Sequence, residues 1–257
     1  MKFARFEYDG TVSFGVVKGE NVILLNGSPF DTYEETEMSH PLAKVKLIPP
    51  VDPTKIVCIG MNYREHIAEI GAEVPEKPMF FLKPPSSLIG HEDDVVIPSG
   101  GERVDYEGEL ALVIKDRMKD ISEDEALNYV AGYSCFNDVT ERALAMKGMA
   151  NLTLAKGFDT FSVLGPYLVT GIDPNNLEIK TYLNGRLVQH DNTKNCVFSA
   201  QHILSYLSHC MTLYPGDIVA TGTPRGIAPM KPGDVVEVEV AGVGRLRNKV
   251  SSHLADS

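Results

Sequence analysis

The strongest candidate for chemistry in this sequence is a pair of carboxylates two residues apart, Glu107 and Glu109. Residues 105–115 are predicted to form a strand, on which side chains two apart point to the same face. Ala111 and Val113 continue that face, which indicates that it points inward. Adjacent buried carboxylates repel each other unless a cation lies between them, and a hard divalent cation suits their oxygens. The alternative is a solvated sheet edge, because this spacing is common.

A third carboxylate, Asp138, closes an apolar segment over residues 130–138 that is predicted to be a strand. Functional groups often project from the end of a strand, so Asp138 could complete a metal site with the glutamate pair. The alternative is an N-cap, because an aspartate between a strand and a helix satisfies free backbone donors. A helical stretch is predicted around Arg142, and both interpretations therefore stay open.

Two other segments carry groups that suit an anionic ligand. Lys156 is flanked by apolar residues and followed by glycine, so it could point into a pocket and polarise a carbonyl or hold a carboxylate. Residues 221–226, Thr-Gly-Thr-Pro-Arg-Gly, follow a predicted strand and offer hydroxyls and exposed amides. The alternatives are a surface lysine and a plain turn.

A histidine and a glutamate form the candidate acid–base pair. Residues 62–70 are predicted to be an amphipathic helix, on which His66 and Glu69 lie three residues apart and can touch. A carboxylate beside an imidazole orients it and raises its basicity, as a general base requires. A surface ion pair is the alternative. The segment is not a zincin motif, because it lacks a second histidine four residues after the first.

The elements that must position these groups are mostly strands joined by tight turns. Asn184-Gly185 and Asp9-Gly10 are two-residue hairpin signals. The other predicted elements are strands at 3–8, 12–17, 21–25, 179–183, 187–189, 235–240 and 246–250, and a helix at 199–210. Because the helices are irregularly placed, we expect a β-rich α+β protein rather than a βαβ array. We place a small N-terminal β domain at residues 1–50 and a catalytic domain at 51–257.

Composition limits the class of protein. The chain has 257 residues, a net charge of −11 and 43% hydrophobic residues, which argues for a folded protein. An acidic protein is poorly suited to nucleic acid or an anionic membrane as its main partner. There is no apolar run of about 20 residues and no signal-peptide pattern, so we expect a soluble, cytoplasmic protein. The four cysteines are widely spaced, and we expect free thiols.

Taken in order, these segments resemble the fumarylacetoacetate hydrolase family. The similarity extends from about Pro50 to the C-terminus. The motifs that carry it are Ile59-Gly60-Met61-Asn62-Tyr63, Phe81-Leu82-Lys83-Pro84-Pro85-Ser86-Ser87, Asp105-Tyr106-Glu107-Gly108-Glu109-Leu110, Asn137-Asp138, Ala155-Lys156-Gly157-Phe158-Asp159 and Thr221-Gly222-Thr223-Pro224. Each motif is modest alone, but the series in this order is specific.

The resemblance implies a β-roll of mixed sheets, a small N-terminal domain and a homodimer. It also implies roles for individual residues. Those roles are Mg²⁺ or Mn²⁺ ligands for Glu107, Glu109 and Asp138, catalysis for His66, Glu69 and Lys156, and substrate binding for Arg142, Asp159, Gly222 and Thr223. His66 and Glu69 would lie on a mobile segment that closes over the site. One departure is Ala145, since members active on acylpyruvates often have glutamine there.

The candidate ligands suit several reactions that share an enolate, and the metal site does not choose between them. Three carboxylates on an octahedral Mg²⁺ leave about three positions open, two of which a 2-oxo acid can fill. The metal would stabilise the enolate formed when a C–C bond breaks or a proton moves. We expect hydrolysis of an acylpyruvate-type 1,3-diketone, with His66 activating water. The alternatives are isomerisation of 2-hydroxyhepta-2,4-diene-1,7-dioate, decarboxylation or tautomerisation of oxaloacetate, or a catalytically silent metal-binding protein.

Overall fold

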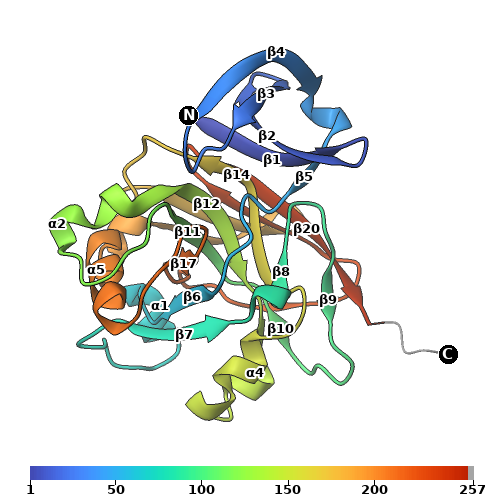
Figure 1. Ribbon diagram of the computed structural model, residues 1–257. Coiled ribbons are helices and arrows are strands. Elements are labelled where there is room, and N and C mark those ends of the chain that lie inside the picture. Colours follow the sequence, from blue (N-terminus) through green and yellow to red (C-terminus); the bar gives the residue numbers. More distant parts are fainter. Residues whose placement is uncertain (254–257) are drawn as a thin grey trace.

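Twelve strands form one sheet in the computed structural model, which describes residues 1–253 (Figure 1). Ten of them follow the order β4 (Tyr33–Pro41), β3 (Asn21–Gly27), β2 (Thr11–Lys18), β1 (Lys2–Tyr8), β14 (Ser162–Val169), β12 (Val130–Asp138), β11 (Gly108–Ile114), β17 (Ile218–Ala220), β6 (Ile56–Gly60) and β7 (Met79–Lys83). The other two are β5 (Lys46–Ile48) beside β1 and β8 (Leu88–Ile89) beside β14. Parallel β17–β6 and β14–β8 pairs make this sheet mixed, as predicted.

Two smaller sheets and a few short helices complete the fold. The sheets are β13 (Thr140–Glu141), β10 (Val104–Asp105) and β18 (Pro229–Met230), and then β16 (Arg186–Asn192), β15 (Glu178–Leu183), β19 (Val235–Val240), β20 (Gly244–Ser252) and β9 (Val95–Ile97). The helices are α1 (Arg64–Glu69), α2 (Glu123–Ala126), α3 (Arg142–Ala145), α4 (Leu152–Lys156) and α5 (Ala200–Cys210), with 3₁₀ turns at Leu42–Lys44, Pro85–Ser87, Leu127–Tyr129, Met149–Asn151 and Thr193–Asn195. The β-rich mixed-sheet class is confirmed.

The two predicted hairpin turns form as expected. Asn184 and Gly185 have φ values of 52° and 76°, and Asp9 and Gly10 have 48° and 76°. Both central residues of each turn are therefore left-handed, which matches the twist of the flanking strands. These turns pair β15 with β16 and β1 with β2.

The N-terminal strands extend the large sheet, because β1 pairs with β14 through Lys2 opposite Val169 and Phe3 opposite Leu168. In Figure 1 these strands lie at the top of the molecule, above the rest of the chain. Strand β4 is absent from the elements predicted from the sequence. This outer strand buries none of its residues fully, so it lacks an apolar alternation. The division at residue 50 stays a prediction.

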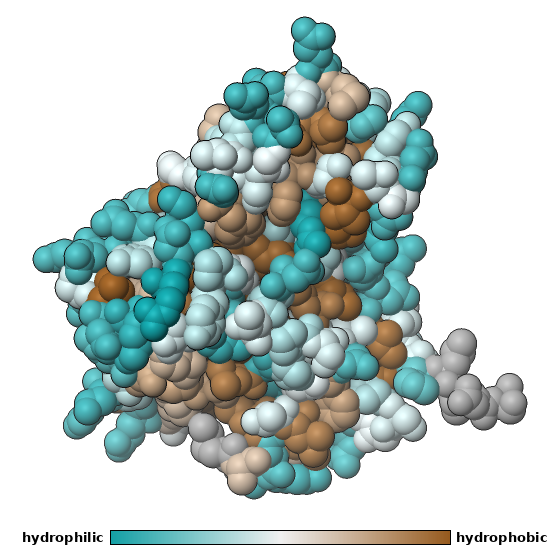
Figure 2. All heavy atoms as spheres, viewed as in Figure 1, coloured by the Kyte–Doolittle hydropathy of each residue, from teal (hydrophilic) through white to brown (hydrophobic). Residues whose placement is uncertain are grey.

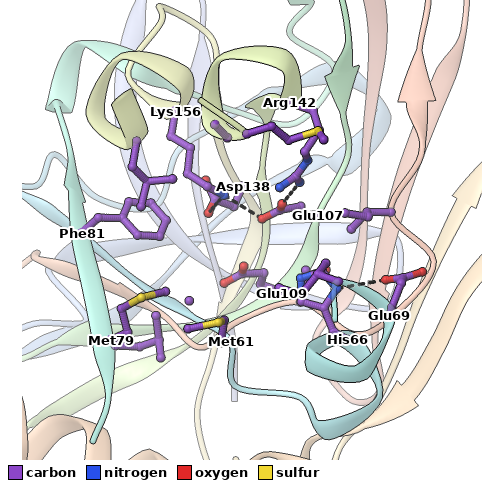
Figure 3. Close-up of a pocket in the computed structure, with 18 of the residues that line it drawn as sticks. Met61, His66, Glu69, Met79, Phe81, Glu107, Glu109, Asp138, Arg142 and Lys156 are labelled. Carbon is purple, nitrogen blue, oxygen red and sulfur yellow. Dashed lines mark hydrogen bonds and ion pairs between the residues drawn. The ribbon is translucent and has the colours of Figure 1, made fainter. Parts of the chain in front are cut away.

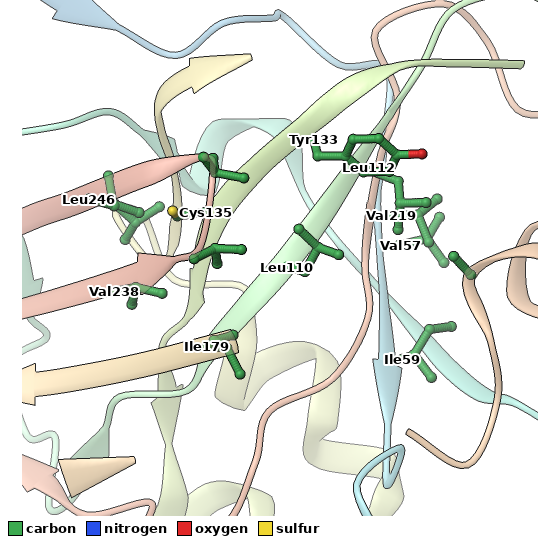
Figure 4. Packing of buried hydrophobic residues seen from close by; sticks show 14 of the residues in the cluster. Val57, Ile59, Leu110, Leu112, Tyr133, Cys135, Ile179, Val219, Val238 and Leu246 are labelled. Carbon is green, nitrogen blue, oxygen red and sulfur yellow. The ribbon is translucent and has the colours of Figure 1, made fainter. Parts of the chain in front are cut away.

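The central strand β11 is buried on both faces. Leu110, Leu112 and Ile114 belong to a core cluster that also contains residues of β15, β19, β20 and α5. Figure 4 shows Leu110 beside this second layer of strands. Ala111 and Val113 belong to a separate cluster on the opposite face, so Glu109, two residues before Ala111, lies on this second face.

The predicted strand at 105–115 is wrong near its start. It is split into β10 and β11, and Tyr106 and Glu107 form the break. The backbone N–H of Glu107 donates to the side-chain Oδ1 of Asn137 rather than to a strand partner (2.9 Å). The alternation of side chains along β11 therefore does not determine the direction of the Glu107 side chain.

The surface carries both hydrophilic and hydrophobic residues. Figure 2 shows hydrophilic residues over most of the visible face, with hydrophobic residues exposed in small groups. Among residues 1–253, no helix is long and apolar enough to cross a bilayer. All four cysteines are free, with Cys58 and Cys135 buried and Cys210 exposed.

We predict that Gly108→Ala destabilises the protein by about 1–3 kcal/mol, the usual cost of overpacking. A Cβ at Gly108 would lie 2.1 Å from Oγ1 of Thr181 and 3.3 Å from the methyl carbons of Val238. The free energy of unfolding in urea measures the loss. Adding Thr181→Ala should recover part of it, because that hydroxyl is buried without a hydrogen-bond partner among the described residues. A single variant as stable as wild type would contradict the close approach.

Candidate active site

Three buried carboxylates meet at one end of the core. One oxygen each of Glu107, Glu109 and Asp138 lies within 4.8 Å of the others, and all three side chains are buried. Glu107 comes from the break before β11, Glu109 from β11 and Asp138 from the end of β12. The hydrogen bond from Asp138 N–H to the carbonyl of Glu107 joins the two segments (2.9 Å). The predicted cluster therefore forms although Glu107 is not in a strand.

Two buried lysines neutralise part of this charge. Lys156, at the end of α4, donates to Oε2 of Glu107 (2.7 Å) and Oδ2 of Asp138 (2.6 Å). Its ammonium also lies 4.9 Å from the ring centre of Phe81. Lys83, at the end of β7, pairs with Oδ1 of Asp138 and donates to the carbonyl of Phe161 (2.6 Å). Asp138 is thus held by two ammonium groups and is not an N-cap.

Arg142 joins Glu107 to a fourth carboxylate. Its Nη2 donates to Glu107, and its Nε donates to Oδ2 of the buried Asp105 (2.9 Å). Burial would raise the pKa of Glu107, but the cations of Lys156 and Arg142 outweigh burial and hold that pKa well below its ordinary value. Glu107 is therefore ionised, and the contacts of Arg142 position it. A contact of Arg142 with substrate stays a prediction.

Glu109 is the carboxylate without a cationic partner. Among the described residues, its carboxylate accepts a hydrogen bond from the backbone N–H of Gly222 (2.8 Å). Burial, together with the negative charges of Asp138 and Glu107, raises its pKa well above the ordinary value. In Figure 3, Glu109 lies between the Glu107–Asp138–Lys156 group and His66.

This arrangement fits a divalent cation. Hard carboxylate oxygens are the ligands that Mg²⁺ and Mn²⁺ prefer, and three are gathered here in a buried position. Glu109 contributes a negative charge that the neighbouring lysines do not match. A bound cation would supply that compensation, so a divalent metal can be held by Glu107, Glu109 and Asp138.

The 221–226 loop supports the carboxylates from the other side. Thr223 donates through Oγ1 to the carbonyl of Gly108 (3.0 Å) and accepts from Nε2 of Gln189 (3.0 Å). Gly222 has φ of 99°, and a Cβ there would lie 2.8 Å from Cβ of Asn62. Glycine is therefore required for the close contact between this loop and the start of α1. Gly222 supports Glu109, and Thr223 lines the cavity.

Helix α1 brings the histidine–glutamate pair to the same place. His66 Nδ1 lies 3.0 Å from Oε2 of Glu69, and His66 is buried with 7% of its surface exposed. The other oxygen of Glu69 accepts the backbone N–H of Gly226 (2.9 Å). The pair thus connects α1 to the 221–226 loop, with His66 buried and Glu69 exposed.

Apart from Gly222 and Asp159, the predicted site residues line one cavity of about 550 Å³. The predicted residues that line it are His66, Glu69, Glu107, Glu109, Asp138, Arg142, Lys156 and Thr223. Asp159 is exposed, because the chain turns away after α4, and the structure gives it no contact with the cavity. Ala145 lines the wall, so the departure from the family pattern lies at the site.

Sequence reasoning missed several residues that hold the site together. They are Asn62, Lys83, Arg103, Asp105 and Gln189. A signal for Lys83 was available, since a lysine ends an apolar strand within a motif that carried the resemblance. The side chain of Asn62 donates to the carbonyl of Thr221 (2.7 Å), but it lies 159 residues away in the chain. No local sequence pattern predicts a contact between residues so far apart in the chain.

Comparison with known proteins agrees with this geometry. The model described as fumarylacetoacetate (FAA) hydrolase C-terminal matches residues 55–251. The chain belongs to the fumarylacetoacetate hydrolase family. A second model, Rv2993c-like N-terminal, matches residues 1–50.

Relatives in this family have several activities. The chain is 37% identical to 2,4-didehydro-3-deoxy-L-rhamnonate hydrolase of Sphingomonas sp., over 100% of this chain and 99% of that one. It is 39% identical to the mitochondrial oxaloacetate tautomerase Fahd2a of Rattus norvegicus, over 82% and 71%. A crystal structure of 2-hydroxyhepta-2,4-diene-1,7-dioate isomerase from Mycobacterium marinum superimposes with a TM-score of 0.91 at 35% identity, covering 99% and 100%. Family members are therefore enzymes of hydrolase, isomerase and tautomerase types.

We predict that Glu109→Gln stabilises the metal-free protein at neutral pH by about 1 kcal/mol, since it removes a buried charge repelled by two carboxylates. The gain should shrink as the pH falls. A raised folded-state pKa means that Glu109 takes up a proton more readily in the folded protein, so its penalty disappears in acid and returns as the pH rises through that pKa.

The matched comparison is Glu107→Gln, which leaves Lys156 paired with Asp138 alone and Arg142 paired with Asp105 alone. It should destabilise the metal-free protein by about 3–5 kcal/mol, as breaking a buried ion pair does. Thermal melts in EDTA between pH 4 and 8 measure both variants. If the two substitutions change stability in the same direction and amount, the proposed charge distribution is wrong.

Proposed function

We propose that this protein is a Mg²⁺- or Mn²⁺-dependent enzyme that hydrolyses a C–C bond of an acylpyruvate-type 2-oxo acid. The observation that carries the proposal is the position of the His66–Glu69 pair. His66 is buried and Glu69 is exposed, and both line the same cavity as the three carboxylates and Lys156. A site for stabilising an enolate and a candidate base for activating water therefore face one substrate volume.

The metal would be held by Glu107, Glu109 and Asp138, and when bound it would supply positive charge and open positions for the oxygens of a 2-oxo acid. Lys156 supplies a positive charge beside Glu107 and Asp138. Burial would lower its pKa, but Asp138 and Glu107 outweigh burial and raise that pKa above the ordinary value. Its ammonium is therefore protonated at neutral pH and can donate to an oxygen that gains negative charge.

His66 is the candidate general base. The carboxylate of Glu69 at Nδ1 favours the tautomer in which Nε2 is free to take a proton. The oxygen of the activated water would add to the distal carbonyl carbon, and the bond between that carbon and the pyruvate methylene would break. The bond electrons remain on the pyruvate fragment as an enolate, which then accepts a proton. The products are a carboxylate and pyruvate, which accounts for all the atoms of water and substrate.

A second candidate is isomerisation or tautomerisation without attack by water, as in 2-hydroxyhepta-2,4-diene-1,7-dioate isomerase or an oxaloacetate tautomerase or decarboxylase. Two observations favour it. The carboxylates and Lys156 suffice to stabilise an enolate, and relatives with these isomerase and tautomerase names match most of the chain. His66 would then move a proton between carbon atoms or take no part.

We predict turnover of acetylpyruvate or fumarylpyruvate with Mg²⁺ and loss of this activity in excess EDTA. The panel should also contain oxaloacetate and the diene substrate, so that hydrolysis is separated from enolate-only reactions. Product formation is followed by the loss of dicarbonyl absorbance. Full activity in EDTA would overturn the metal dependence, and turnover of the diene alone would favour the second candidate.

We predict that His66→Ala lowers hydrolysis about 10²–10⁴-fold, the usual contribution of a general base. Metal and oxalate affinity should stay near wild type, because the carboxylates are untouched. Oxaloacetate decarboxylation should suffer less, since it needs no attacking water. The matched control is His202→Ala, which removes an exposed histidine paired with Glu123 at 2.8 Å. Hydrolysis at the wild-type rate in His66→Ala would place the base elsewhere.

A further inference from the structure

One wall of the cavity carries a cation that the chemistry above does not use. Arg103 lines the same cavity as the three carboxylates and directly precedes β10. Its side chain is 43% exposed, whereas those of Lys156 and Arg142 are 6% and 16% exposed. Arg103 therefore lies at the open part of the cavity, whereas Lys156 and Arg142 form ion pairs with carboxylates at its buried end.

Neighbouring groups hold Arg103 in place. Its Nε donates to Oδ1 of Asp105 (2.9 Å), whose Oδ2 accepts from Arg142 (2.9 Å). Its backbone N–H donates to Oε1 of Glu141 (3.0 Å), and its carbonyl accepts the N–H of Arg142 (2.6 Å). Both backbone and side chain are thus fixed. This lowers the entropy cost of using the side chain for binding.

The terminal nitrogens of Arg103 are available to a ligand. Within residues 1–253, neither Nη1 nor Nη2 makes a hydrogen bond, whereas Nζ of Lys156 donates to both Glu107 and Asp138. Two parallel N–H groups on a planar guanidinium match the two oxygens of a carboxylate. The available edge of Arg103 is therefore suited to a carboxylate.

The cavity leaves room for a substrate that reaches both ends. Its volume of about 550 Å³ exceeds what the 2-oxo acid end of a substrate needs, and apolar Ala145, Met146 and Ile227 line part of the wall. The chain of contacts from Glu107 through Arg142 and Asp105 connects the buried carboxylates to Arg103. A short carbon chain with a carboxylate at each end matches this order of groups.

We propose that Arg103 binds the second carboxylate of the substrate, so that the enzyme prefers dicarboxylic over monocarboxylic 2-oxo acids. The inference rests on the proposed function, because it assumes that the 2-oxo acid end lies at Glu107, Glu109 and Asp138. A monocarboxylate would place an apolar tail against the guanidinium and partly strip it of water without replacing the lost hydrogen bonds. Arg103 is thus a specificity-determining residue, and His66 and Lys156 perform the same chemistry on either class.

The test compares 2-oxoadipate with 2-oxohexanoate, which have the same six-carbon chain and differ in the distal carboxylate. Neither contains the 1,3-dicarbonyl that hydrolysis requires, so calorimetry on the Mg²⁺-loaded protein measures binding alone. Wild type should bind 2-oxoadipate about 10–100-fold more tightly, the scale of a charge-assisted bidentate contact. Arg103→Gln should bring the ratio close to one, chiefly by weakening 2-oxoadipate, and Arg103→Lys should retain part of the preference.

The control is Arg245→Gln, which removes an arginine of similar exposure, 45%, that pairs with Glu239 on the neighbouring strand and is not among the cavity-lining residues. It should leave the ratio unchanged. If Arg103→Gln weakens the binding of both compounds equally, the residue only positions Asp105, and the inference is wrong. It is also wrong if wild type shows no preference. If neither compound binds wild type, the proposed function fails and this inference with it.

Discussion

Burying carboxylates at the end of an apolar core is the constraint on which the rest of the site depends. Each buried ion loses several kcal/mol of hydration, so it must find an opposite charge or a dense set of hydrogen bonds. Asp138 is paired with two lysines, and Glu107 with a lysine and an arginine. Among the described residues Glu109 has neither, and burial with the charges of Asp138 and Glu107 raises its pKa, which marks the place where a further positive charge fits.

The fold supplies these partners from segments far apart in the chain. Lys83 comes from the edge strand β7, Lys156 from α4, and the Gly222 amide from the loop after β17. Strands β6 and β17 lie between β7 and β11, so the order of the sheet sets how far Lys83 lies from Glu109. The close contact of Gly108 with the layer that contains Thr181 and Val238 then fixes the depth of the glutamates. Positioning this charge cluster is thus a property of the whole sheet.

The sequence allowed the strands, their turns and most of the chemical groups to be predicted, because these depend on local patterns. The strand at 130–138, both two-residue turns and the helix after Ser199 form where the sequence predicts them. The break at Tyr106 and Glu107 was not predicted, because there the backbone N–H of Glu107 donates to the side chain of Asn137, which lies on another strand. Asp159 was assigned to the substrate from its place in a motif, but the turn after α4 carries it outward. The homodimer stays a prediction.

One part of the cavity can stabilise charge on a 2-oxo acid fragment, and another part faces the rest of the substrate. This separation is compatible with a family that contains hydrolases, isomerases and tautomerases. All three reactions need negative charge to be stabilised on a 2-oxo acid fragment, which the buried carboxylates, a metal and Lys156 can do together. The reactions differ in what happens beyond that fragment. In this chain the proposed base, His66, is on α1, and the wall around Ala145 and Arg103 belongs to the segments beside α3 and β10. These groups lie outside the carboxylate cluster. Substitutions there can therefore change the substrate or the reaction type without breaking the ion pairs of the buried carboxylates.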